Sequence, residues 1–356
     1  MTTTILENSR IEKLTRQFSR SPLQLNNLQG ADAEIIRLDP RGTVCIAATT
    51  DSIVEEIASG LYHNPYLIGW MTVMANMSDL AAVGAIPLGI LISEVIPSDI
   101  PPELLSELQR GIQKACEACG SFVLGGDTNS GSQLLLTGCA FGTTSRDRLL
   151  SRVGAQPGDQ LYSTGNLGIG NAFALQHLQH PRIAPDDVVP YQPFARLREG
   201  QSIAGVASSC MDTSDGVIAT LDQLMRINHV GIDFRTEIQS CLHPQARLAA
   251  SSAGIPPWYL LAGQHGEFEL LFTVSRENEL ELLDIANGSD WKPLRLGVVI
   301  AEEEIRIPLY GRQAVLDTGK IRNLAFECGS DVRRYIQELS LIDNKCKEGA
   351  LNHVNQ

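Results

Sequence analysis

The sequence predicts a two-domain protein of the α/β (α+β) class. Its 356 residues exceed the size of one ordinary core and fit two domains of about 150 residues each. Hydrophobic residues make up 43% of the chain and charged residues 19%, which is the balance of a compact globular protein. Short apolar or β-branched runs alternate with amphipathic helical patterns, so we expect sheets that are covered by helices.

The first half of the chain begins with a predicted helix and a predicted β-hairpin. Ile11, Leu14 and Phe18 recur at helical spacing and predict a short amphipathic helix over residues 8–18. Two apolar runs, 33–38 and 43–48, flank an Asp-Pro-Arg-Gly turn signal and predict the hairpin. The elements expected next are a buried helix over 65–84, a strand over 86–95, an amphipathic helix that ends at Gly120, and strands over 122–124 and 134–141 that flank Gly125-Gly126-Asp127-Thr128.

A polar stretch over residues 146–158 marks the expected junction between the two domains. The elements expected beyond it are strands over 160–163, 231–234 and 268–274, helices over 171–178 and 215–227, and a proline-rich loop over 181–193. The polar residues from 343 to 356 predict a frayed tail. The predicted domains are therefore 1–148 and 149–330, followed by a C-terminal helix and tail over 331–356.

Charge and targeting features narrow the class of protein. The formal net charge is −13, with 41 acidic and 28 basic residues, and no basic stripe suited to nucleic acid is present. An acidic site can hold a phosphate ester only when metal ions lie between the negative partners. The first residues lack the pattern of a signal peptide, residues 68–95 are too interrupted to span a membrane, and the eight scattered cysteines fit a reducing compartment. We therefore expect a cytoplasmic protein with no nucleic-acid or membrane partner.

Aspartates at the ends of apolar elements are the most informative feature of the sequence. They are Asp32, Asp51, Asp79, Asp127, Asp212 and Asp215, each beside small residues. Taken singly, each has an ordinary explanation as a helix cap or a turn residue. Taken together, several carboxylates near strand ends are costly unless they have partners. Since Mg²⁺ prefers carboxylates combined with phosphate oxygens and water, the set predicts two or more magnesium ions that bridge a triphosphate.

The segments that carry these aspartates resemble a known family of enzymes. The segments are Gly30–Ala33, Thr49–Ser52, Asn76–Ala85, Gly125–Thr128, Arg152–Asp159, Asp212–Gly216 and Gly266–Leu270. Their order and spacing are similar to those of the aminoimidazole ribonucleotide synthetase-like superfamily, which also includes thiamine-monophosphate kinase, selenophosphate synthetase and the hydrogenase-maturation dehydratase. The likeness is greatest to thiamine-monophosphate kinase.

The resemblance implies a fold, an assembly and a set of site residues. The fold would be the two-domain aminoimidazole ribonucleotide synthetase-like fold with a C-terminal α/β sandwich, and the assembly a homodimer whose N-terminal strands pair across the two-fold axis. The implied cofactors are Mg²⁺ and ATP. The implied metal ligands are Asp32, Thr49, Thr50, Asp51, Asp79, Asp127, Asp212 and Asp215. The implied ATP contacts are Gly126, Asp127, Arg152 and Ser214, and the implied catalytic residues are Asp127 and Asp215. An arginine fork suits phosphate oxygens, and a glycine lets the backbone approach the nucleotide closely.

The sequence departs from the thiamine-monophosphate kinase pattern at one potential metal ligand and at the contacts expected for the acceptor. Ala31 replaces the first of two paired aspartates, and Ala58 stands where that family carries a substrate-contacting histidine. The family's Gly-Gly-Glu-Asp-Tyr-Glu-Leu segment reads Gln-His-Gly-Glu-Phe-Glu-Leu over residues 264–270. His265 and Glu267 are therefore the candidate substrate contacts.

We predict transfer of the ATP γ-phosphate to a small metabolite, which can itself be phosphorylated. Metal ions would neutralise the charge that develops on the phosphates. Two alternatives stay open. One is a ligase or dehydratase use of the same site, which would release ADP and phosphate. The other is a nucleotide-binding partner protein without turnover, which Ala31 and Ala58 would favour. The sequence leaves the acceptor, the number of metal ions and the choice between kinase and ligase open.

Overall fold

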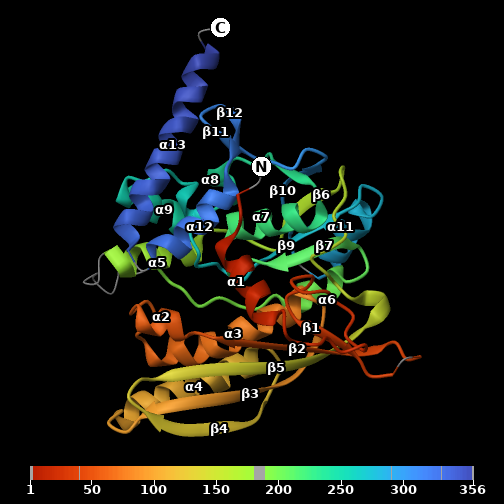
Figure 1. The fold of residues 1–356 in the computed structure, drawn as a ribbon, viewed down its shortest axis with the longest axis vertical. Coiled ribbons are helices and arrows are strands. Elements are labelled where there is room, and N and C mark those ends of the chain that lie inside the picture. The colour runs from red at the N-terminus through yellow and green to blue at the C-terminus, as the bar shows by residue number, and fades with distance from the viewer. Residues whose placement is uncertain (1–2, 40, 180–188, 290, 330, 355–356) are drawn as a thin grey trace.

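Two β-sheets, one in each half of the chain, organise the protein (Figure 1). The computed structural model describes residues 3–39, 41–179, 189–289, 291–329 and 331–354. The N-terminal sheet has the strand order β1-β2-β5-β3-β4. The helices and strands of this N-terminal half are α1 (Leu6–Thr15), β1 (Glu34–Arg37), β2 (Val44–Ser52), α2 (Val54–Ala58), α3 (Pro65–Ala82), β3 (Ile86–Pro97), α4 (Pro102–Ala118), β4 (Val123–Gly131) and β5 (Leu135–Ser145).

The C-terminal sheet has seven strands in the order β12-β11-β8-β10-β6-β9-β7. Its strands are β6 (Gln160–Ser163), β7 (Ala207–Asp212), β8 (Gly231–Phe234), β9 (Leu270–Val274), β10 (Leu294–Ile300), β11 (Ile305–Leu309) and β12 (Arg312–Leu316). The helices around it are α5 (Ile169–Gln179), α6 (Leu197–Ile203), α7 (Val217–Asn228), α8 (Ile238–Cys241), α9 (Pro244–Ala253), α10 (Tyr259–Ala262), α11 (Glu279–Gly288), α12 (Thr318–Cys328) and α13 (Val332–Val354). A short 3-10 turn, η1 (Arg146–Arg148), connects the two halves.

The expected helices and the N-terminal hairpin are confirmed. β1 and β2 pair in antiparallel fashion, and the buried helix expected over 65–84 is α3. The mixed α/β class is therefore confirmed, whereas the domain limits at 148 and 330 stay predictions. Of the proline-rich loop expected over 181–193, residues 181–188 lie outside the described part of the chain, and residues 189–193 are irregular.

Helix α3 is the central element of the molecule. Every residue from Leu67 to Ala82 is buried. The helix crosses α4 at two glycines, since a Cβ on Gly69 would lie 2.0 Å from the Leu108 carbonyl oxygen and one on Gly111 would lie 2.1 Å from that of Tyr66. On its other side α3 packs against α6 of the C-terminal half. Both halves of the protein therefore position the side chains that α3 carries.

Two sequence expectations about secondary structure were wrong. The Gly125–Thr128 segment does not link two strands but lies inside β4, which pairs in parallel with β3 over its whole length. Helix α13 continues to Val354, so the described residues from 343 onward are not a frayed tail. The reason is that Asp343 is buried and accepts hydrogen bonds from Trp258 Nε1 and the Tyr310 hydroxyl, which anchors the helix.

The N-terminal sheet has one covered face and one open face. α3 covers the face to which Cys45, Ala47, Leu136 and Ala140 contribute buried side chains. The opposite face exposes large apolar side chains, and every residue of the edge strand β4 is exposed. These apolar side chains are Val44, Ile86, Leu88, Leu91 and Leu124. Among the described helices, none is long and apolar enough to cross a membrane.

Candidate metal and nucleotide site

Three aspartates from three separate elements meet where the two halves of the chain join. Asp32 lies in the turn before β1, Asp79 near the end of α3, and Asp212 at the end of β7. One carboxylate oxygen of each lies within 4.8 Å of the others. Asp79 is 9% exposed and Asp212 is 1% exposed, so the cluster is shielded from water. Distant parts of the sequence are therefore folded around one small acidic site.

Neighbouring hydroxyl groups fix the orientation of these carboxylates. Thr49 of β2 donates a hydrogen bond to Oδ2 of Asp79. Ser78 of α3 donates to Oδ2 of Asp212 at 2.5 Å, which links the N-terminal helix to the C-terminal sheet. The backbone amide and hydroxyl of Ser214 donate to the other Asp212 oxygen at 3.2 and 2.7 Å.

Arg152 is the cation of this site. Its Nη2 donates to Asp32 Oδ1 at 2.9 Å and its Nε donates to Oδ2 at 3.3 Å, in a two-point ion pair. Burial alone would lower the pKa of Arg152, but the adjacent Asp32 carboxylate raises it above the usual value. Arg152 therefore keeps its charge beside the aspartates, where a phosphate group would need a donor.

The electrostatics of the cluster favour a bound cation. Burial, together with the charges of Asp51, Asp212 and Asp32, raises the pKa of Asp79 well above its ordinary value. Burial and the Asp32 carboxylate raise the pKa of Asp212 to about 7. Carboxylates that resist ionisation near neutral pH are crowded by like charge, and a divalent ion relieves that crowding. The set of hard oxygen donors fits Mg²⁺.

Asp51 and Asp215 lie at the rim of the cluster. Both are exposed residues. The charge of Asp51 raises the pKa of Asp79, and the charge of Asp215 raises the pKa of Asp51 and of Asp212. Burial of its remaining surface and the charges of Asp215 and Asp32 raise the pKa of Asp51 to about 6. The backbone amide of Asp51 donates to Asn76 Oδ1 of α3 at 3.0 Å, which holds the end of β2 against the helix. Asp51 and Asp215 are thus coupled electrostatically to the three clustered aspartates of the same chain.

Asp127 does not join the other five. In the sheet register Ser52, Thr137, Ser93 and Asp127 form one row across β2, β5, β3 and β4. Ser52 and Asp127, the two ends of this row, are separated by three strand spacings of about 4.8 Å each, which is a distance of about 14 Å. Residues along a strand alternate between the two faces of the sheet. Asp51 belongs to the covered face, so its neighbour Ser52 and the other side chains of this row point to the open face. Gly126 lies on the same edge strand.

Thr50 also points away from the cluster. It alternates with Thr49 and Asp51 along β2, and its hydroxyl donates to the Gly138 carbonyl oxygen at 2.8 Å. Its side chain therefore braces β2 against β5. The assignment of Thr50 as a metal ligand stays a prediction.

The segment 264–270 lies directly beside the aspartates. A Cβ on Gly266 would lie 1.4 Å from the Thr213 carbonyl oxygen, so the two backbones touch. Glu267 is buried, and its Oε2 accepts a hydrogen bond from the Gly168 amide at 2.6 Å. Its Oε1 has no partner among the described residues. Burial raises the pKa of Glu267 to about 8, so the side chain is mainly protonated at neutral pH and can donate a hydrogen bond.

His265 is half-buried in the same segment. Its backbone amide donates to Asn171 Oδ1 at 3.0 Å. Burial lowers the pKa of the imidazole to about 4, so the ring is neutral at physiological pH. A protonated glutamate suits a polar acceptor more than an additional metal ion, because a metal ligand has to be deprotonated. The roles of His265 and Glu267 stay predictions.

Several supporting residues were not predicted as part of the site. Ser78 and Asn76 were visible in principle, because polar residues inside an apolar helix need partners. Arg196 gave no such signal: its Nε donates to Glu269 Oε2 at 2.8 Å and holds the end of the 264–270 segment. Its partner lies 73 residues away in the sequence, so only the fold reveals the pair.

The fold and the carboxylate cluster together define a protein of the AIR synthase-related class. Residues 30–144 match the family model described as AIR synthase related protein, N-terminal domain. The chain is 30% identical over 261 residues to the thiamine-monophosphate kinase of Pyrococcus horikoshii, covering 71% of this chain and 79% of that protein. It is 32% identical over 234 residues to the thiamine-monophosphate kinase of Methanospirillum hungatei, covering 65% of this chain and 76% of that protein. The chain belongs to the thiamine-monophosphate kinase family, and the predicted enzyme class is confirmed as a kinase.

Solved structures support the same fold. The thiamine monophosphate kinase of Aquifex aeolicus superimposes with a TM-score of 0.65 at 21% identity, covering 85% of this chain and 97% of that one. The hydrogenase maturation protein HypE of E. coli superimposes with a TM-score of 0.67 at 20% identity, covering 88% and 98%. At these identities the likeness concerns the fold alone. The expected aminoimidazole ribonucleotide synthetase-like fold is confirmed.

Proposed function

We propose that this protein is a Mg²⁺-dependent kinase that transfers the γ-phosphate of ATP to thiamine monophosphate. The observation that carries the proposal is the convergence of Asp32, Asp79 and Asp212 in a chain of the thiamine-monophosphate kinase family. A structure of ThiL, a relative with a TM-score of 0.70 and 22% identity, was solved in complex with AMPPCP and TMP. An ATP analogue and the proposed acceptor thus bind together to a protein of this fold.

The three clustered aspartates would hold the metal ions, with Asp51 and Asp215 completing the set at the rim. Bound Mg²⁺ would neutralise negative charge on the β- and γ-phosphates. Arg152 would donate its guanidinium N–H groups to phosphate oxygens, and Ser214 would donate its amide. Thr49 and Ser78 keep the carboxylates in place, so little reorganisation is needed when the nucleotide binds.

The open face of the N-terminal sheet supports a homodimer. An exposed edge strand beside an apolar face is a liability for a monomer, because it invites pairing with another chain. β4 and the apolar side chains beside it have both properties. In the proposed dimer Asp127 and Gly126 of one protomer would serve the site of its partner, which explains why Asp127 lies apart from the cluster in its own chain.

Glu267 and His265 would contact the acceptor. The protonated carboxyl of Glu267 can donate a hydrogen bond to a ring nitrogen, which a charged carboxylate cannot do. Ala58, at the exposed end of α2, leaves space where the family pattern has a histidine. The acceptor would then be oriented mainly from the C-terminal half of the chain.

The test is to incubate the purified protein with γ-labelled ATP, Mg²⁺ and thiamine monophosphate, and to identify the labelled product. We expect label in thiamine diphosphate, and no product in EDTA. If the label appears only as inorganic phosphate, and its amount equals the amount of acceptor that is converted, the kinase reaction is contradicted. A ligase or dehydratase reaction is then favoured. Nucleotide binding without any turnover would favour the inactive partner protein.

A further inference from the structure

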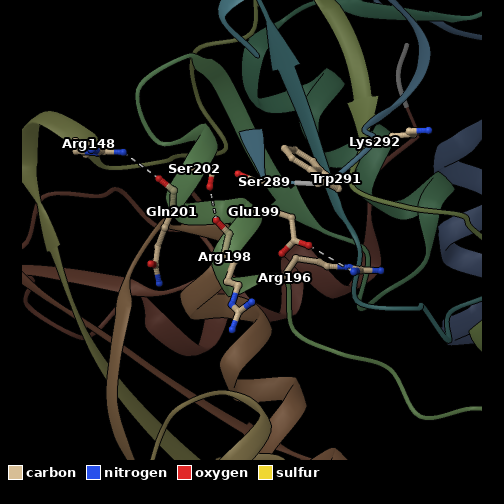
Figure 2. Close-up of a pocket in the computed structure, with 9 residues that line it drawn as sticks. All are labelled: Arg148, Arg196, Arg198, Glu199, Gln201, Ser202, Ser289, Trp291 and Lys292. Carbon is tan, nitrogen blue, oxygen red and sulfur yellow. Dashed lines mark hydrogen bonds and ion pairs between the residues drawn. The ribbon is translucent and has the colours of Figure 1, made fainter. Parts of the chain in front are cut away.

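A cavity of about 780 Å³ lies between α6 and the residues that follow α11, apart from the aspartate cluster (Figure 2). This volume lies in the range of small-molecule sites, about 300–1,000 Å³. No aspartate of the candidate metal site lines it. The residues that matter for its chemistry are Arg148, Arg196, Arg198, Glu199, Trp291 and Lys292. We call it the basic cavity.

The basic cavity collects positive charge in a protein whose formal net charge is −13. Of the described residues, four cationic side chains and one carboxylate line it. Within the described chain, Arg148, Arg198 and Lys292 form no ion pair. Because cations outnumber the carboxylate on this concave surface, its field favours small anions.

Among the described residues, two carboxylates near the basic cavity, those of Glu199 and Glu269, contact Arg196. Arg196 donates from Nε to Glu269 at 2.8 Å, and its Nη1 lies 3.6 Å from Glu199 Oε1. One arginine charge thus faces two acids and compensates only part of their negative charge. Arg148, Arg198 and Lys292 keep a smaller positive excess at the described lining of the cavity.

The walls of the basic cavity are held in position before any ligand binds. Arg148 Nη2 donates to the Gln201 carbonyl oxygen at 3.0 Å, and Trp291 Nε1 donates to that of Thr164 at 2.9 Å. The Trp291 ring also packs at 6.2 Å from the ring of Phe272. The Arg148 guanidinium, held in this way, offers donors that match phosphate oxygens, and the fixed indole offers a flat apolar surface to the rest of the ligand.

We propose that the basic cavity binds a phosphate-bearing small molecule and does so without a metal ion. This separates it from the aspartate cluster, where negative charge repels phosphate unless Mg²⁺ is present. Binding here is independent of the proposed kinase reaction.

The test uses pyrophosphate as the probe and isothermal titration calorimetry in the presence of EDTA. EDTA removes divalent ions, so the aspartate cluster does not bind the probe. We expect saturable binding to the full-length protein that weakens as KCl is added, because screening reduces the attraction between exposed charges. The same titration with inorganic phosphate distinguishes a single-phosphate ligand from a larger one.

Arg148→Ala and Arg198→Ala, made separately, should each weaken pyrophosphate binding at least about tenfold, since each removes a charge-assisted donor. The matched control is Arg276→Ala, because Arg276 is an exposed arginine on the C-terminal half. The control should bind pyrophosphate like wild type. Unchanged thermal unfolding of the variants shows that they fold. No binding by wild type in EDTA, or equal binding by all three variants, would overturn the proposal.

Discussion

Arg152 donates to both carboxylate oxygens of Asp32, at 2.9 and 3.3 Å, across the junction between the two halves of the chain. The Asp32 carboxylate is 1% exposed and the Arg152 side chain 18% exposed, so the pair is shielded from water. It keeps one negative charge of the acidic cluster compensated in the absence of metal. The same two residues therefore contribute to the stability of the folded protein and to the proposed metal and nucleotide site.

Replacing Arg152 by Ala should destabilise the metal-free protein by about 3 kcal/mol, because Asp32 is left as an uncompensated buried charge. Added Mg²⁺ should restore part of this loss, since a bound cation replaces the missing positive charge. The measurement is denaturant unfolding in EDTA and in Mg²⁺. Arg276→Ala serves as the exposed control. A loss for Arg152→Ala no larger than that of the control would contradict the role of the pair.

The stability of the metal-free protein should fall as pH rises. Asp212 has a pKa of about 7 and Asp51 one of about 6 in the folded state, whereas aspartate in an unfolded chain titrates near about 3.9. Between about pH 4 and pH 7 the folded state binds more protons than the unfolded state, so the free energy of unfolding decreases as pH increases.

Thermal unfolding in EDTA from about pH 5 to about pH 8 measures this slope. Asp212→Asn should reduce the fall in Tm, since the amide does not ionise, and Mg²⁺ should also reduce it in wild type. A wild-type Tm that rises across this range in parallel with that of Asp212→Asn would show that the cluster does not carry the effect.

Asp212→Asn should lower Mg²⁺-dependent ATP turnover by at least about 100-fold, because the amide is a neutral and weaker ligand in a preorganised electrostatic site. The control is Asp284→Asn, since Asp284 is an exposed aspartate on α11. Steady-state assays with thiamine monophosphate check both variants. Equal turnover in the two variants would exclude Asp212 from the reaction.

Asp127 tests the proposed sharing of residues between protomers. Asp127→Asn and Asp79→Asn should each be inactive alone. Mixed under conditions that allow subunit exchange, they should recover about one quarter of wild-type activity, since half of the dimers are mixed and each mixed dimer has one intact site. Absence of recovery, with exchange verified by mass spectrometry, would place Asp127 in the site of its own chain or outside the site.

Local sequence patterns predicted much of the fold but missed the strand β4. Helices such as α3 and α4 carry continuous apolar patterns and clear end signals, which act over a few residues. The Gly125–Thr128 segment has glycines and an aspartate, which disfavour strands, so its extended form depends on pairing with β3. Such a partner, about thirty residues away, is not visible in the local pattern.

The sequence predicted which residues form the candidate site better than it predicted how their side chains are arranged in space. The motifs identified Asp32, Asp79 and Asp212, which do meet in space. They could not reveal that Asp127 faces the open side of the sheet, since that depends on register. They also gave no sign of Arg196, whose partner Glu269 lies on a different element. Side-chain partners that are distant in sequence are set by tertiary packing.

Binding of Mn²⁺ tests the central claim most directly, because this ion favours the same oxygen ligands as Mg²⁺ and its free form is measured by electron paramagnetic resonance. The titration is made with a non-hydrolysable ATP analogue, on wild type, Asp212→Asn and the Asp284→Asn control. We predict tight Mn²⁺ binding by wild type and by the control, and a loss of at least about tenfold in affinity for Asp212→Asn. Equal Mn²⁺ affinity in all three proteins would contradict the assignment of the aspartate cluster as the metal site.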